Sequence, residues 1–178
     1  MGKLIVVRHG ETNYNVQGRY TGSTDIELND KGYEQAKILA EKLKDISIDI
    51  IISSTLKRAK ETARIISNKM NIPLIEMDEL VEKCVGVYEG LTREEAKNQY
   101  PLMWEANSPE GAETLETVEK RVHKALYTIL NDYSEDKNVL IVAHGYISKV
   151  IYKYFNNASE IDFSKYVLKN CEYDEYII

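Results

Sequence analysis

The residues of this 178-residue chain best able to do chemistry stand directly behind short aliphatic stretches. Arg8 and His9 follow one stretch, His144 follows another, and Arg58 lies a few residues behind a third. An arginine fork donates two parallel hydrogen bonds to a phosphate group, and a neutral imidazole is a good nucleophile toward phosphorus. Brought together, these side chains would form a pocket that binds a phosphate group and transfers it.

The three aliphatic stretches, residues 3–7, 48–52 and 138–143, have the composition of strands buried on both faces. Parallel strands direct their carboxyl ends to one edge of a sheet, where ligands bind in open α/β folds. We expect the glycines behind the two histidines, Gly10 and Gly145, to let a ligand approach the backbone. Amides at the starts of the following helices should add favourable dipoles.

Amphipathic patterns predict the helices that cover this sheet. The expected helices are approximately 29–43, 56–70, 93–100, 115–129 (capped by Thr114) and 146–155. A short strand is expected near 73–76, the rest of 78–113 should be irregular, and the tail should hold short strand-like pieces. The chain is therefore predicted to be α/β, a three-layer α/β/α sandwich with a mostly parallel sheet in a single domain, residues 1–178.

A leaving alkoxide needs a proton, so the pocket requires a carboxylic acid as well. Glu82 is the candidate, while Glu11, Glu79 and Glu89 compete with it on spacing alone. Tyrosines near the strand ends are candidates to line the pocket. These tyrosines are Tyr14, Tyr20 and Tyr88.

Composition limits the classes of function. Hydrophobic residues make up 43% of the chain and charged residues 29%, as in soluble globular proteins. The net charge of −6 argues against a nucleic-acid binder. No stretch is long enough to span a membrane, no signal peptide is recognisable, and Cys84 and Cys171 lack metal-like spacing. We expect a cytoplasmic protein with no metal, organic cofactor, nucleic-acid or membrane partner.

The motifs resemble those of the histidine phosphatase superfamily, also called the phosphoglycerate mutase-like family. Its RHGET signature is matched at residues 8–12. Further resemblance follows in the family's order at 21–36, 53–63, 80–90, 109–122 and 142–145. The resemblance implies a phosphoglycerate mutase-like fold, His9 as the nucleophile that becomes phosphohistidine, and Glu82 as the proton donor.

The resemblance also implies three kinds of substrate contact: ligands of the phosphate, a further hydrogen-bond donor, and less certain backbone contacts. The implied phosphate ligands are Arg8, Arg58 and His144, and the implied further donor is Asn15. The implied backbone contacts are at Thr21, Gly22 and Gly145.

Glycolytic mutases of the family carry a longer insertion before the second histidine, with paired arginines that hold a carboxylated substrate. This chain has no Arg-Arg pair, and Arg93 is a single arginine able to reach a carboxylate. The predicted activity is therefore hydrolysis of a small-molecule phosphomonoester. Phosphoglycerate mutase and a non-catalytic phosphate-ligand sensor are the alternatives. A phosphoprotein substrate and a homodimer are left open.

Overall fold

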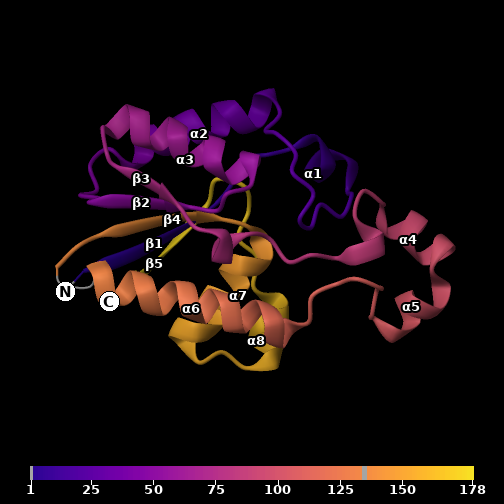
Figure 1. Cartoon of the computed structure of the whole chain (residues 1–178). Helices are drawn as coiled ribbons and strands as arrows, with labels where there is room; N and C mark the ends of the chain where they lie inside the picture. The colour runs from indigo at the N-terminus through magenta and orange to yellow at the C-terminus, as the bar shows by residue number, and fades with distance from the viewer. Residues whose placement is uncertain (1, 134–135) are drawn as a thin grey trace.

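A five-stranded sheet lies at the centre of the computed structural model, which describes residues 2–133 and 136–178 (Figure 1). Its strand order is β3-β2-β4-β1-β5. The strands are β1 (Lys3–Arg8), β2 (Ile50–Ser53), β3 (Leu74–Glu76), β4 (Val139–Ala143) and β5 (Tyr173–Ile177). β1 to β4 pair in parallel and β5 runs antiparallel to β1. The predicted α/β class with a mostly parallel sheet is confirmed.

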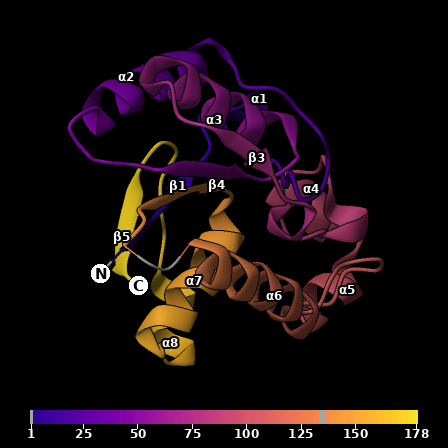
Figure 2. The ribbon, with the colours of Figure 1, turned by 60° about the vertical axis from the view of Figure 1, so that its left-hand side comes forward.

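Helices cover both faces of the sheet. They are α1 (Asn13–Gln17), α2 (Asp30–Leu43), α3 (Lys57–Met70), α4 (Arg93–Gln99), α5 (Pro101–Ala106), α6 (Leu115–Tyr133), α7 (Gly145–Asn156) and α8 (Glu160–Lys165). Figure 2 shows α2 and α3 on one face and α6 and α7 on the other, which gives the three-layer sandwich. None of these helices, within the described residues, combines the length and apolar character that crossing a membrane requires.

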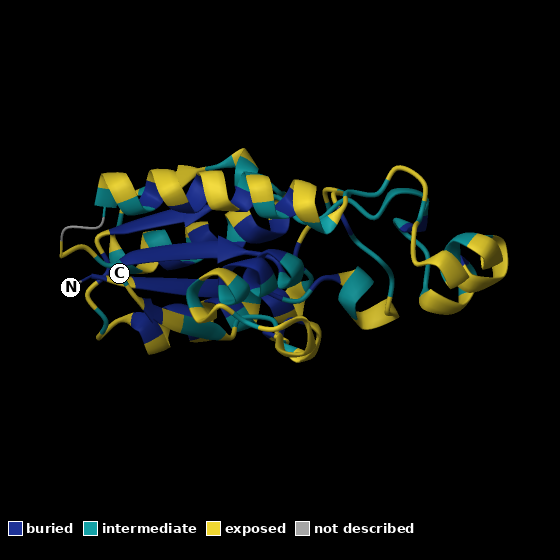
Figure 3. Cartoon of the chain, turned by 90° about the horizontal axis from the view of Figure 1, so that it is seen from below, coloured by how far each residue is buried: buried dark blue, intermediate teal, exposed yellow. Residues whose placement is uncertain are grey.

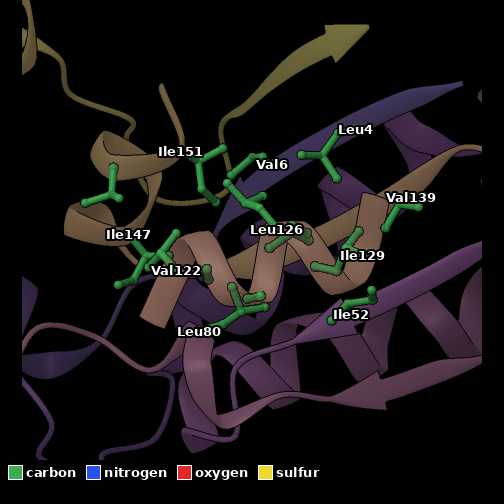
Figure 4. Close-up of a cluster of buried hydrophobic side chains, with 14 of the residues drawn as sticks. Leu4, Val6, Ile52, Leu80, Val122, Leu126, Ile129, Val139, Ile147 and Ile151 are labelled. Atoms are coloured by element: carbon green, nitrogen blue, oxygen red, sulfur yellow. The ribbon is translucent and has the colours of Figure 1, made fainter. Parts of the chain in front are cut away.

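Side chains of alternate residues in the central strands pack into two separate hydrophobic cores, because successive side chains of a strand point to opposite faces of the sheet. Leu4 and Val6 of β1 pack toward α6 and α7, where Leu126 and Ile151 meet them (Figure 4). Ile5 of β1 belongs to the opposite core under α2 and α3. All of these side chains are fully buried. Burial on both faces explains why the central strands read as continuous aliphatic stretches.

The strand register brings the polar strand ends together. Arg8 pairs with Ala143 across β1 and β4, so His9 and His144 leave the sheet side by side. The His9 amide donates to the Ala143 carbonyl at 3.0 Å. β2 ends beside the same edge, and the first turn of α3 behind it carries Arg58.

Three short helices differ from the expectations. α1, α5 and α8 have five or six residues each, too few to show a helical period in the sequence. The expected irregular segment therefore contains α5, which begins at Pro101, a favoured first position. The tail contains α8 and a single antiparallel strand, β5, instead of several strand-like pieces.

Helices α4 and α5 project beyond the carboxyl edge of the sheet, and mostly exposed residues cover their outer surfaces (Figure 3). Aromatic rings pack where these helices meet the rest of the protein. The ring centroid of Tyr88 lies 5.7 Å from that of Tyr20, 6.1 Å from that of Tyr100 and 6.2 Å from that of Trp104. This aromatic cluster fixes the projecting segment beside the strand ends.

Candidate active site

A cavity of about 290 Å³ opens at the carboxyl edge of the sheet. Seven of the nine predicted site residues line it. They are Arg8, His9, Asn15, Thr21, Gly22, Arg58 and Glu82. A larger hollow of about 380 Å³ lies beside α3, but its described lining contains no histidine or arginine. The smaller cavity is therefore the candidate site for chemistry.

The surroundings of His9 favour a neutral imidazole. Its ring is buried, and Nδ1 lies 2.7 Å from the Gly10 carbonyl oxygen, which can only accept a hydrogen bond. Nδ1 therefore carries the proton, and Nε2 keeps its lone pair. Burial, together with the charges of Arg58 and Arg8, holds the pKa of His9 well below its usual value. The lowered pKa favours the neutral imidazole, with its single proton on Nδ1.

His144 and Gly145 are the two predicted site residues that do not line the cavity in the described part of the chain. His144 lies behind His9, with ring centroids 5.2 Å apart. Its Nε2 lies 2.8 Å from Ser54 Oγ, and its buried Nδ1 has no hydrogen-bond partner among the described residues. Burial, and next the charge of Arg58, lower the pKa of His144 well below its usual value.

Arg8 and Arg58 line the cavity. Neither guanidinium forms a direct ion pair with a carboxylate of the described residues. Arg8 Nη1 donates to the Leu168 carbonyl at 2.9 Å. Arg58 donates from Nη1 to Thr24 at 2.8 Å and from Nη2 to Gly22 at 2.9 Å, again to carbonyl oxygens. Carbonyl groups fix the guanidinium planes without neutralising them, so both arginines can attract an anion.

Asn15 and Gly22 complete the rim beside the arginines. Asn15 Oδ1 accepts hydrogen bonds from Thr12 and Asn170, while Asn15 Nδ2 bonds to no other described residue and can donate to a ligand. Gly22 has a φ of 52°, and a Cβ there would meet the carboxylate of Glu89. The positive φ therefore favours glycine at this position.

Glu82 faces the same cavity from the loop before α4. Its Oε1 accepts from the Lys83 amide at 2.8 Å and its Oε2 from the Tyr146 amide at 3.2 Å. Burial raises the pKa of Glu82 against the opposing effect of these hydrogen bonds and of Arg58 and Arg8. The carboxyl therefore holds a proton to higher pH than an exposed glutamate.

The contact with Tyr146 corrects one expectation. Tyr146 lies in the first turn of α7, so an amide expected to face a ligand binds the catalytic candidate Glu82 instead.

The competing carboxylates have other partners and do not line the cavity in the described structure. Glu11 and Glu79 accept hydrogen bonds from Lys31 and Lys124, which lower the pKa of each. Burial alone would raise the pKa of Glu89, but hydrogen bonds from Thr24, Ser23 and Val85 outweigh it and lower the pKa. Only Glu82 combines cavity exposure with a raised pKa among these four.

An arginine that the sequence did not single out holds the loop of Glu82. Arg121 of α6 forms a bidentate pair with Glu113, both contacts at 2.9 Å. It also donates to the carbonyls of Glu79, Val81 and Glu82 at 2.8, 2.6 and 3.3 Å. The contact is between segments about 40 residues apart, so spacing along the chain carried no signal for it.

The two glycines behind the histidines have different surroundings. A Cβ on Gly10 would lie 2.6 Å from the carbonyl oxygen of Gly32 in α2, so close helix packing requires this glycine. The nearest atoms to a Cβ on Gly145 belong to the Arg8 side chain, at 3.6 Å, which is ordinary contact. Close packing therefore accounts for Gly10, and the approach of a ligand to Gly145 stays a prediction.

Five further residues line the cavity. They are Arg19, Tyr20, Lys83, Val85 and Tyr146. Of the three candidate tyrosines, Tyr20 lines the cavity, whereas Tyr14 and Tyr88 are not among its described lining. The other four were missed because their segments carry no charge or aromatic pattern that distinguishes them from surface loops.

Comparisons with known proteins show the family and the fold of this chain. A family model of the histidine phosphatase superfamily, branch 1, matches residues 4–177. The chain is 43% identical to an uncharacterized phosphatase, PhoE, of Bacillus subtilis, over 82% of this chain and 72% of that protein. It is 33% identical to phosphoserine phosphatase 1 of Hydrogenobacter thermophilus, over 100% of this chain and 86% of that protein. The solved structure of Bacillus stearothermophilus YhfR superposes with a TM-score of 0.87 at 28% identity, covering 97% and 88% of the two chains.

Proposed function

This chain belongs to the histidine phosphatase superfamily, and from that premise we propose that it hydrolyses a small-molecule phosphomonoester through a phosphohistidine at His9. The observation that carries the proposal is the neutral His9, with Nδ1 bonded to Gly10 and Nε2 available, in one cavity with Glu82. Phosphatases among the relatives support the reaction class.

In the first step the lone pair of His9 Nε2 attacks phosphorus and forms a P–N bond. The P–O bond to the alcohol breaks, its electron pair stays on the departing oxygen, and protonated Glu82 supplies the proton. Arg8 and Arg58 stabilise the negative charge on the non-bridging oxygens during transfer. The raised pKa of Glu82 supports its role as the acid.

In the second step Glu82, now ionised, removes a proton from water as the water attacks phosphorus. The P–N bond breaks, its electrons return to Nε2, and inorganic phosphate leaves. His9 is again neutral and Glu82 again protonated, so the enzyme regenerates itself.

The test is phosphate release from a panel of phosphomonoesters, combined with mass spectrometry of enzyme quenched during turnover. We expect release by the wild type and an acid-labile phosphoryl group on His9. His9→Ala should lose both, whereas His123→Ala, which changes an exposed histidine of α6, should keep both.

The proposal fails if His9→Ala releases phosphate at the wild-type rate. Isomerisation of 3-phosphoglycerate after priming with its bisphosphate, without hydrolysis, would instead identify a mutase. Phosphate binding without either reaction would identify a sensor.

A further inference from the structure

The turn that precedes β5 lies against the carboxyl end of β1. The Glu172 amide donates to the Lys169 carbonyl at 3.0 Å and closes this turn, with Asn170 and Cys171 at its centre. Cys171 has a left-handed φ of 55°, and its amide donates to the Arg8 carbonyl at 2.9 Å. These backbone contacts fix Asn170 beside the strand end that carries the nucleophile.

The carboxamide of Asn170 links the nucleophile to the rim of the cavity. Its Nδ2 lies 2.8 Å from the His9 carbonyl oxygen and 3.3 Å from Asn15 Oδ1. Because the His9 carbonyl can only accept a hydrogen bond, the atom of Asn170 that faces it is the amino nitrogen. This nitrogen carries two hydrogens, so one is available for each of the two acceptors.

The orientation of the Asn15 carboxamide follows from its partners. Its Oδ1 also accepts a hydrogen bond from the Thr12 amide at 3.1 Å, and a backbone amide can only donate. With Thr12 and Asn170 both donating to Oδ1, the end of the carboxamide left for a ligand is Nδ2. Asn15 lines the cavity, whereas Asn170 is not among the described residues of its wall.

We propose that Asn170 is a positioning residue, which holds the Asn15 carboxamide so that Nδ2 donates to the phosphate attacked by His9. Asn170 acts through Asn15 and does not touch the substrate. A donor held by hydrogen bonds behind it keeps the geometry that phosphate binding needs. This role rests on the proposed function, because it needs a phosphate bound in the cavity beside His9.

A double-mutant cycle tests the role, with inorganic phosphate as the ligand and isothermal titration calorimetry as the measurement. Asn170→Ala should weaken phosphate binding about 5- to 10-fold, through partial loss of a charge-assisted hydrogen bond. In the Asn15→Ala background the same change should weaken binding less than about 2-fold, because no carboxamide is left to position. Asn156→Ala, which removes a contact between a side chain and a carbonyl at the far end of α7, should leave binding unchanged.

Equal losses from Asn170→Ala in the two backgrounds would overturn the role, because a residue that only supports the fold acts independently of Asn15. Unchanged phosphate affinity in Asn170→Ala would overturn it as well. Urea unfolding checks that each variant is folded. If Asn170→Ala is unfolded, Asn170→Gln, which moves the carboxamide by one methylene, enters the same cycle with the same criterion.

Phosphate binding also separates this inference from the proposed function. A wild type that hydrolyses no ester and forms no phosphohistidine would remove the proposed function. The cycle on phosphate affinity would still decide whether Asn170 acts through Asn15, because binding of inorganic phosphate does not require turnover.

Discussion

His9 is buried and Glu82 half-buried beside the cavity, and desolvation displaces their pKa values in opposite directions. Desolvation disfavours the charged form of each group, so it lowers the pKa of His9 and raises that of Glu82. The favoured forms are the neutral imidazole and the protonated carboxyl, which are the forms a nucleophile and an acid need. One physical cause, desolvation, therefore favours the forms that the proposed nucleophile and the proposed acid need.

Glu82→Gln tests the acid. We expect kcat/KM for an alkyl phosphate to fall by about 10²-fold or more. Because 4-nitrophenolate leaves without a proton, the loss for 4-nitrophenyl phosphate should be much smaller. The wild-type rate for alkyl esters should also decline as pH rises through the pKa of Glu82, and this decline should be missing in the variant. Equal losses for both esters would exclude Glu82 as the acid.

At the scale of elements, the loop that carries Glu82 depends on α6. Arg121 donates hydrogen bonds to three carbonyl groups of this loop and to the carboxylate of Glu113. The Glu113 carboxylate also accepts a hydrogen bond from the Cys84 amide at 2.9 Å. The helix thereby places the loop, and the loop places the acid over the strand ends.

Arg121→Gln should lower the free energy of unfolding by about 2 kcal/mol, because several partly buried acceptors lose their donor. It should also reduce kcat for alkyl esters more than for 4-nitrophenyl phosphate, since the acid is misplaced. Urea unfolding and steady-state kinetics measure the two effects. Lys124→Gln, which removes only an exposed ion pair to Glu79, is the control and should change stability by less than about 1 kcal/mol. Equal behaviour of the two variants would contradict this role of Arg121.

The junction of β1 and α2 gives a second prediction at this scale. Gly10→Ala should destabilise the protein by about 1–3 kcal/mol, because its Cβ would lie 2.6 Å from a backbone oxygen. Gly145→Ala should change stability by less than about 1 kcal/mol, since its Cβ finds ordinary contacts. Chemical denaturation of the two variants decides between close packing and ligand approach as the reason for Gly10. A tolerated Gly10→Ala would reject close packing.

At the scale of the whole molecule, a buried histidine of the site makes the free energy of unfolding depend on pH. His144 is fully buried, and its pKa lies well below the usual 6.5. Below pH 6.5 the unfolded chain takes up a proton that the folded chain excludes. The stability that neutral His144 contributes is therefore complete well above pH 6.5 and is lost as the pH falls below this value.

The free energy of unfolding should consequently fall more steeply with acidification in the wild type than in His144→Gln. The expected difference is roughly 1 kcal/mol between pH 6.5 and 5.5, because at pH 6.5 half of the unfolded chains already hold the proton. Urea titrations of both proteins at pH 7.5, 6.5 and 5.5 measure it. Parallel pH dependences would show that folded His144 takes up the proton.

The sequence by itself determined the class of fold and the identity of the strongest site candidates. Residues 4–7 and 139–143 are continuously aliphatic because both faces of a central parallel strand are buried, and this property is local. His9 and His144 follow these strands directly, so their convergence depends only on parallel strand ends sharing an edge.

The tertiary structure decided what local pattern cannot encode. Spacing alone did not choose Glu82 among four carboxylates. The family resemblance pointed to it, and its desolvation and its contact with the Tyr146 amide give the physical reason. Residues far apart in the chain are likewise joined by the contacts of Arg121, by the contact of Lys83 with an aromatic ring and by the packing of Gly10. Such contacts leave no periodic signal, because only the folded chain brings their partners within bonding distance.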